Sequence, residues 1–155
     1  MASLQIASTR GNFEAVQRTQ ATQLTNDVIY RMRTNSERLD VYAVSDLGGG
    51  TITTAPSQCT DLMTTEECLT AMANRDRWEL EQAADHADTL INPRICITHD
   101  AANPGNVKVV VAWRGISEST VNSADSLDAC GKTTIDTDYL KQVIINTFIT
   151  TINPY

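Results

Sequence analysis

Four cysteines are the residues whose type and spacing could carry chemistry: Cys59, Cys68, Cys96 and Cys130. None of them forms a C-x-x-C pair, and neither histidine of the chain lies at ligand spacing from a cysteine, which disfavours a zinc ribbon or a thioredoxin-like redox site. An even number of cysteines without metal spacing favours two disulfides and an oxidising compartment. Three pairings are possible, and we favour the sequential one, Cys59 with Cys68 and Cys96 with Cys130. The alternative is four reduced, buried thiols.

The other reactive residue types form no catalytic set. No G-x-S-x-G sequence is present, and His86 and His99 lie beside aspartates in segments that are typical of solvated polar surface. Four aspartates could offer oxygen ligands to calcium in an extracellular protein: Asp85, Asp88, Asp136 and Asp138. No 12-residue loop of oxygen ligands accompanies them. We therefore predict no catalytic residue, no metal ligand and no cofactor.

The first predicted element is a long helix over residues 3–35, because this segment contains no proline and a single glycine. Apolar residues recur along it at helical spacing and predict its packing face: Phe13, Val16, Leu24, Val28 and Met32. Such a helix would be roughly 45 Å long, more than a domain of this size can cover. We therefore expect its start, up to about Gly11, to project from the body.

The rest of the chain divides into a loop, a second helix and a sheet. Residues 36–64 are glycine- and threonine-rich and predict a loop, and residues 65–90 predict a helix that Thr64 caps. Residues 94–155 predict antiparallel strands and loops, with a turn at residues 101–106. Apolar residues at strand spacing predict the sheet core: Ile95, Ile97, Val109, Val111, Trp113, Val143 and Ile145. The order of elements predicts an α+β fold.

Length and composition bound the class of protein. The 155 residues suit one domain, and a formal net charge of -7 argues against nucleic acid as the main partner. No signal peptide and no apolar run long enough to span a membrane are visible. Up to Arg38 there are five arginines against three acidic residues, so the acidic excess lies in the rest of the chain. A mildly basic helix joined to an acidic head suits contacts between neighbouring subunits, although ordinary surface variation would give the same balance.

Several motifs in order resemble one known family. The "DxxxRMRxN" ending of the helix at residues 27–35 is the most specific, and Arg77-Trp78 follows in the second helix. Residues 93–97 then begin the sheet, residues 107–115 give a "VxVxVxWxG" strand, and Cys130-Gly131 precede the last strand. Over nearly the whole chain this set resembles the type IV pilus modification protein PilV, a minor pilin.

The resemblance implies a pilin fold, in which a long N-terminal helix packs on an antiparallel sheet. Minor pilins begin with a prepilin peptidase site and an apolar half-helix that spans the membrane, neither of which is in this sequence, and we expect such a segment to precede it in the full-length protein. The family implies an inner-membrane anchor with a periplasmic head before assembly and an extracellular pilus afterwards. It implies a non-catalytic subunit that takes part in priming pilus assembly, at or near the fibre tip, in support of twitching motility and adhesion.

The resemblance also implies partners and surfaces. The partners are other minor pilins and the major pilin, with a pilus-tip adhesin as a further candidate. The projecting part of the helix would bear on assembly through Leu4, Ile6, Phe13 and Val16, while the stripe from Val16 to Met32 would pack on the chain's own sheet. The loop before Cys59 and the region between Cys96 and Cys130 are further candidate partner surfaces.

Three other functions stay open from the sequence. A minor pseudopilin of a type II secretion system would share the architecture and serve a different machine. An extracellular module that binds calcium or sugar would use the acidic surface or the two tryptophans. A small secreted hydrolase would need a nucleophile and a base, and we find no such arrangement.

Overall fold

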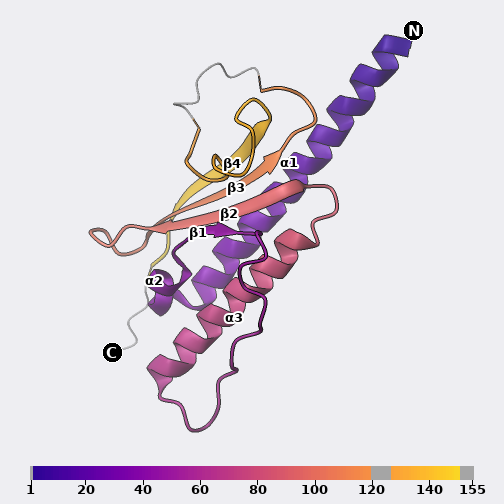
Figure 1. Cartoon of the computed structure of the whole chain (residues 1–155). Coiled ribbons are helices and arrows are strands. Elements are labelled where there is room, and N and C mark those ends of the chain that lie inside the picture. The colour runs from indigo at the N-terminus through magenta and orange to yellow at the C-terminus, as the bar shows by residue number, and fades with distance from the viewer. Residues whose placement is uncertain (1, 120–126, 151–155) are drawn as a thin grey trace.

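The computed structural model describes residues 2–119 and 127–150, except for the side chains of residues 2–4. Its elements are a long helix, two short helical segments, a second helix and four strands in one sheet (Figure 1). This arrangement confirms the predicted α+β fold. The side chain of Leu4, and the parts of the predicted loop and sheet regions at residues 120–126 and 151–155, lie outside the described residues.

The long helix α1 runs over Ala2–Thr34. Its last turn carries Arg31 and Arg33, cations that complement the partial negative charge of a helix C-terminus. Asn35 then ends the helix, and its side-chain amide donates to the Leu69 carbonyl at 2.9 Å. Figure 1 shows that the N-terminal half of α1 extends beyond the sheet, as its length predicts.

The connection at residues 36–64 is more ordered than the predicted loop. It contains the 3-10 helix η1 (Ser36–Arg38), the short helix α2 (Leu39–Tyr42) and the strand β1 (Val44–Leu47). Gly48 follows at φ 94°, where an added Cβ would lie 2.4 Å from the Pro93 carbonyl oxygen. The close approach requires glycine, so this glycine serves tight packing and not flexibility.

The second helix, α3, spans Thr65–Asp85 and is shorter than the predicted 65–90. Thr64 and Glu67 form a reciprocal capping box at its start, as the sequence predicts. Its end comes early because tight turns replace the helical ladder: the Ala87 N–H bonds the Ala84 carbonyl at 3.1 Å, and the Leu90 N–H bonds the Ala87 carbonyl at 2.8 Å. These turns bury Ala87 and Leu90 in the core.

The sheet has the order β1-β2-β3-β4, with every neighbouring pair antiparallel. Strand β2 runs over Ile91–His99, β3 over Asn106–Arg114 and β4 over Leu140–Phe148. Strand β2 begins three residues before the predicted boundary because Asn92 and Pro93 are taken into the strand, where the pairing with β3 shifts register between Ile91 and Arg94. A register shift is one of the few places where a strand tolerates proline.

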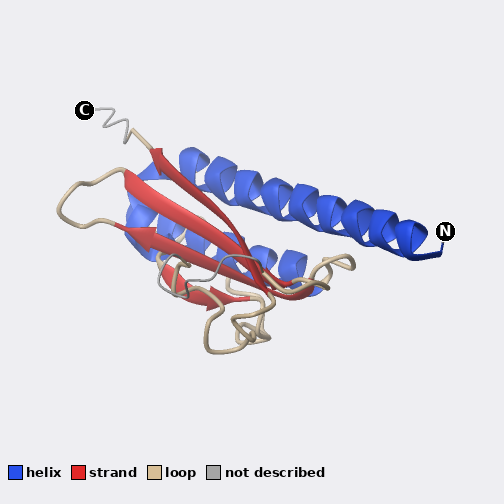
Figure 2. Cartoon of the chain, turned by 90° about the horizontal axis from the view of Figure 1, so that it is seen from above, coloured by secondary structure: helices blue, strands red, loops and turns tan. Residues whose placement is uncertain are grey.

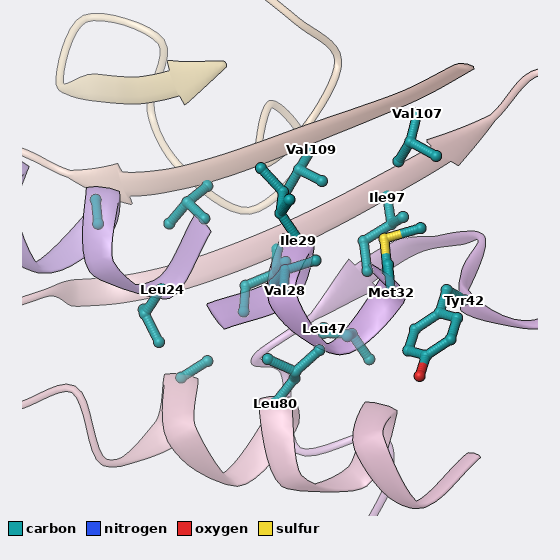
Figure 3. Packing of buried hydrophobic residues seen from close by; sticks show 14 of the residues in the cluster. Leu24, Val28, Ile29, Met32, Tyr42, Leu47, Leu80, Ile97, Val107 and Val109 are labelled. Carbon is teal, nitrogen blue, oxygen red and sulfur yellow. The ribbon is translucent and has the colours of Figure 1, made fainter. Parts of the chain in front are cut away.

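The main core lies between this sheet and the two long helices, which pack on the same face (Figure 2). Figure 3 shows Val28 and Met32 of α1 between the sheet and Leu80 of α3. Five of the predicted sheet-core residues are buried in this cluster, and two pack against it partly buried: Ile95, Ile97, Val109, Val111 and Trp113, then Val143 and Ile145.

A second, smaller core covers the opposite face of the sheet. The disulfide Cys96–Cys130 lies in it with Val110, Ala112 and Leu140. Cys96 belongs to β2 and Cys130 to the segment between β3 and β4, so the bond holds that segment against the sheet. The other disulfide, Cys59–Cys68, ties the connection to the first turn of α3. The structure therefore contains both bonds of the sequential pairing.

Candidate assembly surface

The projecting half of α1 carries the first candidate interaction surface. Ile6, Phe13 and Val16 are 54%, 37% and 51% exposed. At 100° per residue they fall within about 80° of the helix circumference, so they form one apolar stripe. We call these three residues the projecting stripe. An exposed apolar stripe of this kind offers a packing face to another helix.

The position of this stripe corrects two predictions. Phe13 and Val16 were expected on the face that packs within the chain, and Val16 was expected to meet the sheet, but both are exposed. The buried face starts at Gln17 instead, which is fully buried and bonded to the turn before β2. Along the buried half, Leu24, Val28 and Met32 pack in the core as expected.

Sequence reasoning missed the polar members of the buried face. Gln17 and Thr25 are fully buried although both are polar. The Gln17 amide donates to the Thr89 carbonyl at 2.9 Å, and the Thr25 hydroxyl donates to the Ala21 carbonyl at 2.8 Å. These bonds offset the cost of burying the Gln17 amide nitrogen and the Thr25 hydroxyl. The neighbouring Gln20 accepts from the Thr89 hydroxyl. Thr89 thus bonds two residues of α1 at the point where the projecting half begins.

A cluster of charged side chains fixes α1 to α3 at the other end. Arg31 contacts Asp27 at 3.1 Å, Asp76 at 3.0 Å and Glu79 at 2.7 Å. Burial alone would lower the pKa of Arg31, but its bonds to Glu79, Asp27 and Asp76 raise that pKa above its ordinary value. Burial and the bond to Asp76 raise the pKa of the Tyr42 hydroxyl. This cluster holds the C-terminal end of α1 against α3.

A further bond ties the start of the projection to the segment after β3. The Ser117 hydroxyl donates to the Glu14 carboxyl group. Glu14 lies between Phe13 and Ala15, so the contact orients the turn of α1 that carries Phe13. The projecting stripe is therefore presented by a helix that is anchored on two sides where it leaves the head.

Two carboxyl groups with lowered pKa values make the stability pH-dependent. The bond from Arg31 lowers the pKa of Glu79 despite partial burial. Burial would raise the pKa of Asp128, but the bonds from Lys108 and from the Cys130 N–H lower it. A lowered folded-state pKa gives stability that is complete above the unfolded-state pKa values, about 4, and is lost as pH falls through the folded-state values.

We therefore expect urea unfolding to give a free energy that is flat between pH 7 and 5 and falls below pH 4. The double variant Glu79→Gln with Asp128→Asn should show a shallower fall between pH 4 and 2, because the lost carboxyl groups no longer take up protons on unfolding. The variant Asp61→Asn at an exposed carboxyl group is the matched control. A double variant with an unchanged slope would contradict the assignment.

The remaining residues with candidate chemistry lie apart. His86 caps the end of α3 beside the Gln82 carbonyl, and His99 ends β2. Within residues 2–119 and 127–150, no group of three His, Cys, Asp or Glu side chains could hold a metal ion. Trp78 stacks under the Arg75 guanidinium at 5.1 Å, while Trp113 lies in the core. In the described part of the chain the two tryptophans thus have separate surroundings.

Among the described residues, no helix has the length and apolar character needed to cross a membrane. Residues 3–78, which hold α1, the connection and the first two-thirds of α3, match a family model described as Tt1218-like, Type IV pilin Tt1218. Neither the curated proteins nor the solved structures gave a significant match. Over that stretch, just under half of the chain, the sequence is similar to a type IV pilin.

Proposed function

We propose, on the premise that the chain falls within the type IV pilin family matched by residues 3–78, that it is a non-catalytic subunit of a pilus. The observation that carries the proposal is the projecting half of α1, a rigid helix with an exposed apolar stripe and a firmly packed head at its base. A subunit of this shape assembles by helix packing, because burial of the stripe against neighbouring helices supplies the driving force.

The finer role that we propose is that of a minor pilin similar to PilV, which takes part in priming pilus assembly at or near the fibre tip. The ordered motifs from residue 27 to Cys130-Gly131 support this role. Its partners would be other minor pilins and the major pilin, with a tip adhesin as a further candidate. The head would lie in the periplasm before assembly, held by an inner-membrane anchor, and outside the cell afterwards. The two disulfides suit that route.

Substitutions in the projecting stripe test this proposal. In a strain that lacks the gene, native full-length protein should restore surface pili and twitching motility, whereas Phe13→Glu with Val16→Glu should leave piliation about tenfold lower. Placing carboxyl groups on a helix face that is buried between subunits removes the apolar contact and costs desolvation. Surface pili are counted by electron microscopy and by the yield of sheared pilin.

The matched control is Leu62→Glu, an acidic substitution at a fully exposed residue of the connection. It should restore pili as well as the native chain. Both variants should unfold within about 0.5 kcal/mol of the native chain, because neither site is buried. Full piliation by the stripe variant, or full piliation without the gene, would overturn the proposal.

A further inference from the structure

The two edges of the sheet differ in how they are protected. Strand β1 is four residues long, pairs irregularly with β2 and carries Asp46, whose carboxyl group lies 3.5 Å from the Arg94 guanidinium. Short length, irregular pairing and charge are the features that keep an edge strand from pairing with another chain. Strand β4 has none of them over residues 142–148, which contain no charge and no proline and hold one register with β3.

The register shows which backbone groups of β4 face outward. The Ile149 N–H bonds the Gly105 carbonyl at 2.8 Å, and the Gly115 N–H bonds the Tyr139 carbonyl at 2.8 Å. In an antiparallel pair the bonded positions alternate, so the odd-numbered residues of β4 bond to β3 and the even-numbered residues direct N–H and C=O to the open edge. Among the described residues, none offers a backbone partner to the outward groups of Gln142, Ile144, Asn146 and Phe148.

The side chains of the same edge are apolar and exposed. Ile144 and Phe148 are 43% and 61% exposed on the face opposite the helices, with Asn146 between them. Their spacing matches the alternation of a strand that would pair alongside. The side-chain amide of Gln142 donates to the Asp128 and Cys130 carbonyls at 3.0 and 2.8 Å, so the segment between β3 and β4 contacts this side chain. The stretch with exposed side chains therefore starts after Gln142.

A groove adjoins the start of this edge and carries unmet hydrogen-bonding capacity. It has a volume of about 560 Å³, and residues from both faces of β4, Lys141 and Ile144, line it. Gln17 and Trp113 also line it, and in the described part of the chain the Gln17 Oε1 and the Trp113 Nε1 are buried without a partner. Buried polar atoms are rarely left unpaired, and a peptide group supplies the missing donor and acceptor together.

We propose that an extended segment of a different polypeptide adds as a fifth strand along residues 142–148 of β4. The segment is uncharged, alternates apolar residues that meet Ile144 and Phe148, and places one peptide group in the groove beside Trp113. Backbone hydrogen bonds give its affinity, and the exposed apolar side chains give its register.

The choice of a different chain over a second copy rests on the proposed function. Antiparallel pairing of two β4 strands relates the copies by a two-fold axis, which sets their α1 helices in opposite directions. Subunits anchored in one membrane through the start of α1 share one direction. A segment from another component of the pilus meets no such conflict, and it gives the chain a way to hold a partner independently of the projecting stripe.

Photo-cross-linking in cells tests the inference. Benzoyl-phenylalanine replaces Ile144 or Phe148 in the full-length protein, with Leu62 as the exposed control position, and mass spectrometry maps the cross-linked residues. We expect the two edge probes to reach one segment of one other chain at residues about four apart, as paired strands require, and the Leu62 probe to miss that segment. Cross-links to β4 of a second copy, to scattered positions or to nothing would overturn the inference.

A backbone variant separates strand addition from ordinary surface contact. Ile144→Pro removes an outward N–H and spares the bonds to β3, while Ile144→Thr trims the same side chain and keeps the N–H. The proline variant should lower the cross-link yield at Phe148 about tenfold, and the threonine variant should change it far less. Asn146→Lys, which places a charge on the edge, should act like the proline variant and serves if the latter fails to fold.

The same cells distinguish a failure of strand addition at β4 from a failure of the proposed pilin role. If the chain is present in sheared pili and the edge probes find no common segment, strand addition is wrong and the pilin role stands. If the chain is absent from pili that form at normal number without it, the proposed function fails.

Discussion

Replacing Cys96 and Cys130 together by alanine is expected to lower the free energy of unfolding by about 4 kcal/mol. The bond joins residues 34 apart in sequence, so its loss frees a long loop in the unfolded chain. In the folded chain it holds the segment between β3 and β4 over the smaller core, and both cysteines are buried there. Alanine at both sites also leaves apolar space beside Val110.

The other disulfide supplies the matched control. Cys59 and Cys68 are only nine apart in sequence, and Cys59 is exposed. Their replacement should cost less, about 3 kcal/mol, since a shorter loop is closed and little apolar surface is uncovered. Urea unfolding of both variants under non-reducing conditions measures the difference. A larger loss at the Cys59–Cys68 site would contradict the placement of Cys96–Cys130 at the second core.

Removing the buried carboxyl group of Glu81 is expected to have the second large effect. This group is fully buried on α3 and accepts from the Gly48 N–H at 3.0 Å and the Thr51 N–H at 2.9 Å. Leucine at this position leaves two backbone donors without their acceptor. Since Gly48 is buried and Thr51 is partly accessible, we expect a loss of about 3 kcal/mol, which corresponds to a fall in Tm of roughly 6–12 °C.

Glu81→Gln is the control for this prediction. It keeps the size of the side chain and one carbonyl oxygen, so it can satisfy one of the two donors and should cost about half as much. Thermal unfolding followed by circular dichroism measures both variants. Equal losses for leucine and glutamine would contradict this account, because glutamine keeps the size of the side chain and one of the two acceptor oxygens.

The sequence predicted elements with strong local patterns. The spacing of Leu24, Val28 and Met32 is that of a buried helix face, and Val109 and Val111 alternate with the period of a strand. The capping box at Thr64 marks the start of α3 by local chemistry alone. These features depend on residues near each other in the chain, which is why they could be found without a structure.

The missed features depend on partners far apart in the chain. Strand β1 is too short to show a pattern, and its register comes from pairing with β2 some 50 residues later. Gln17 looks like a solvated residue until the Thr89 carbonyl is placed beside it. The open edge of β4 follows from the strand order, which residues 140–148 do not encode by themselves.

The presence of the chain in the fibre is the most direct test of the central claim. Pili sheared from the native strain, purified and digested, should yield peptides of this chain by mass spectrometry in amounts well below those of the major pilin, and the strain without the gene should yield few pili and none of these peptides. Normal pili that contain no peptide of this chain, with unchanged pilus number after deletion of the gene, would contradict the account.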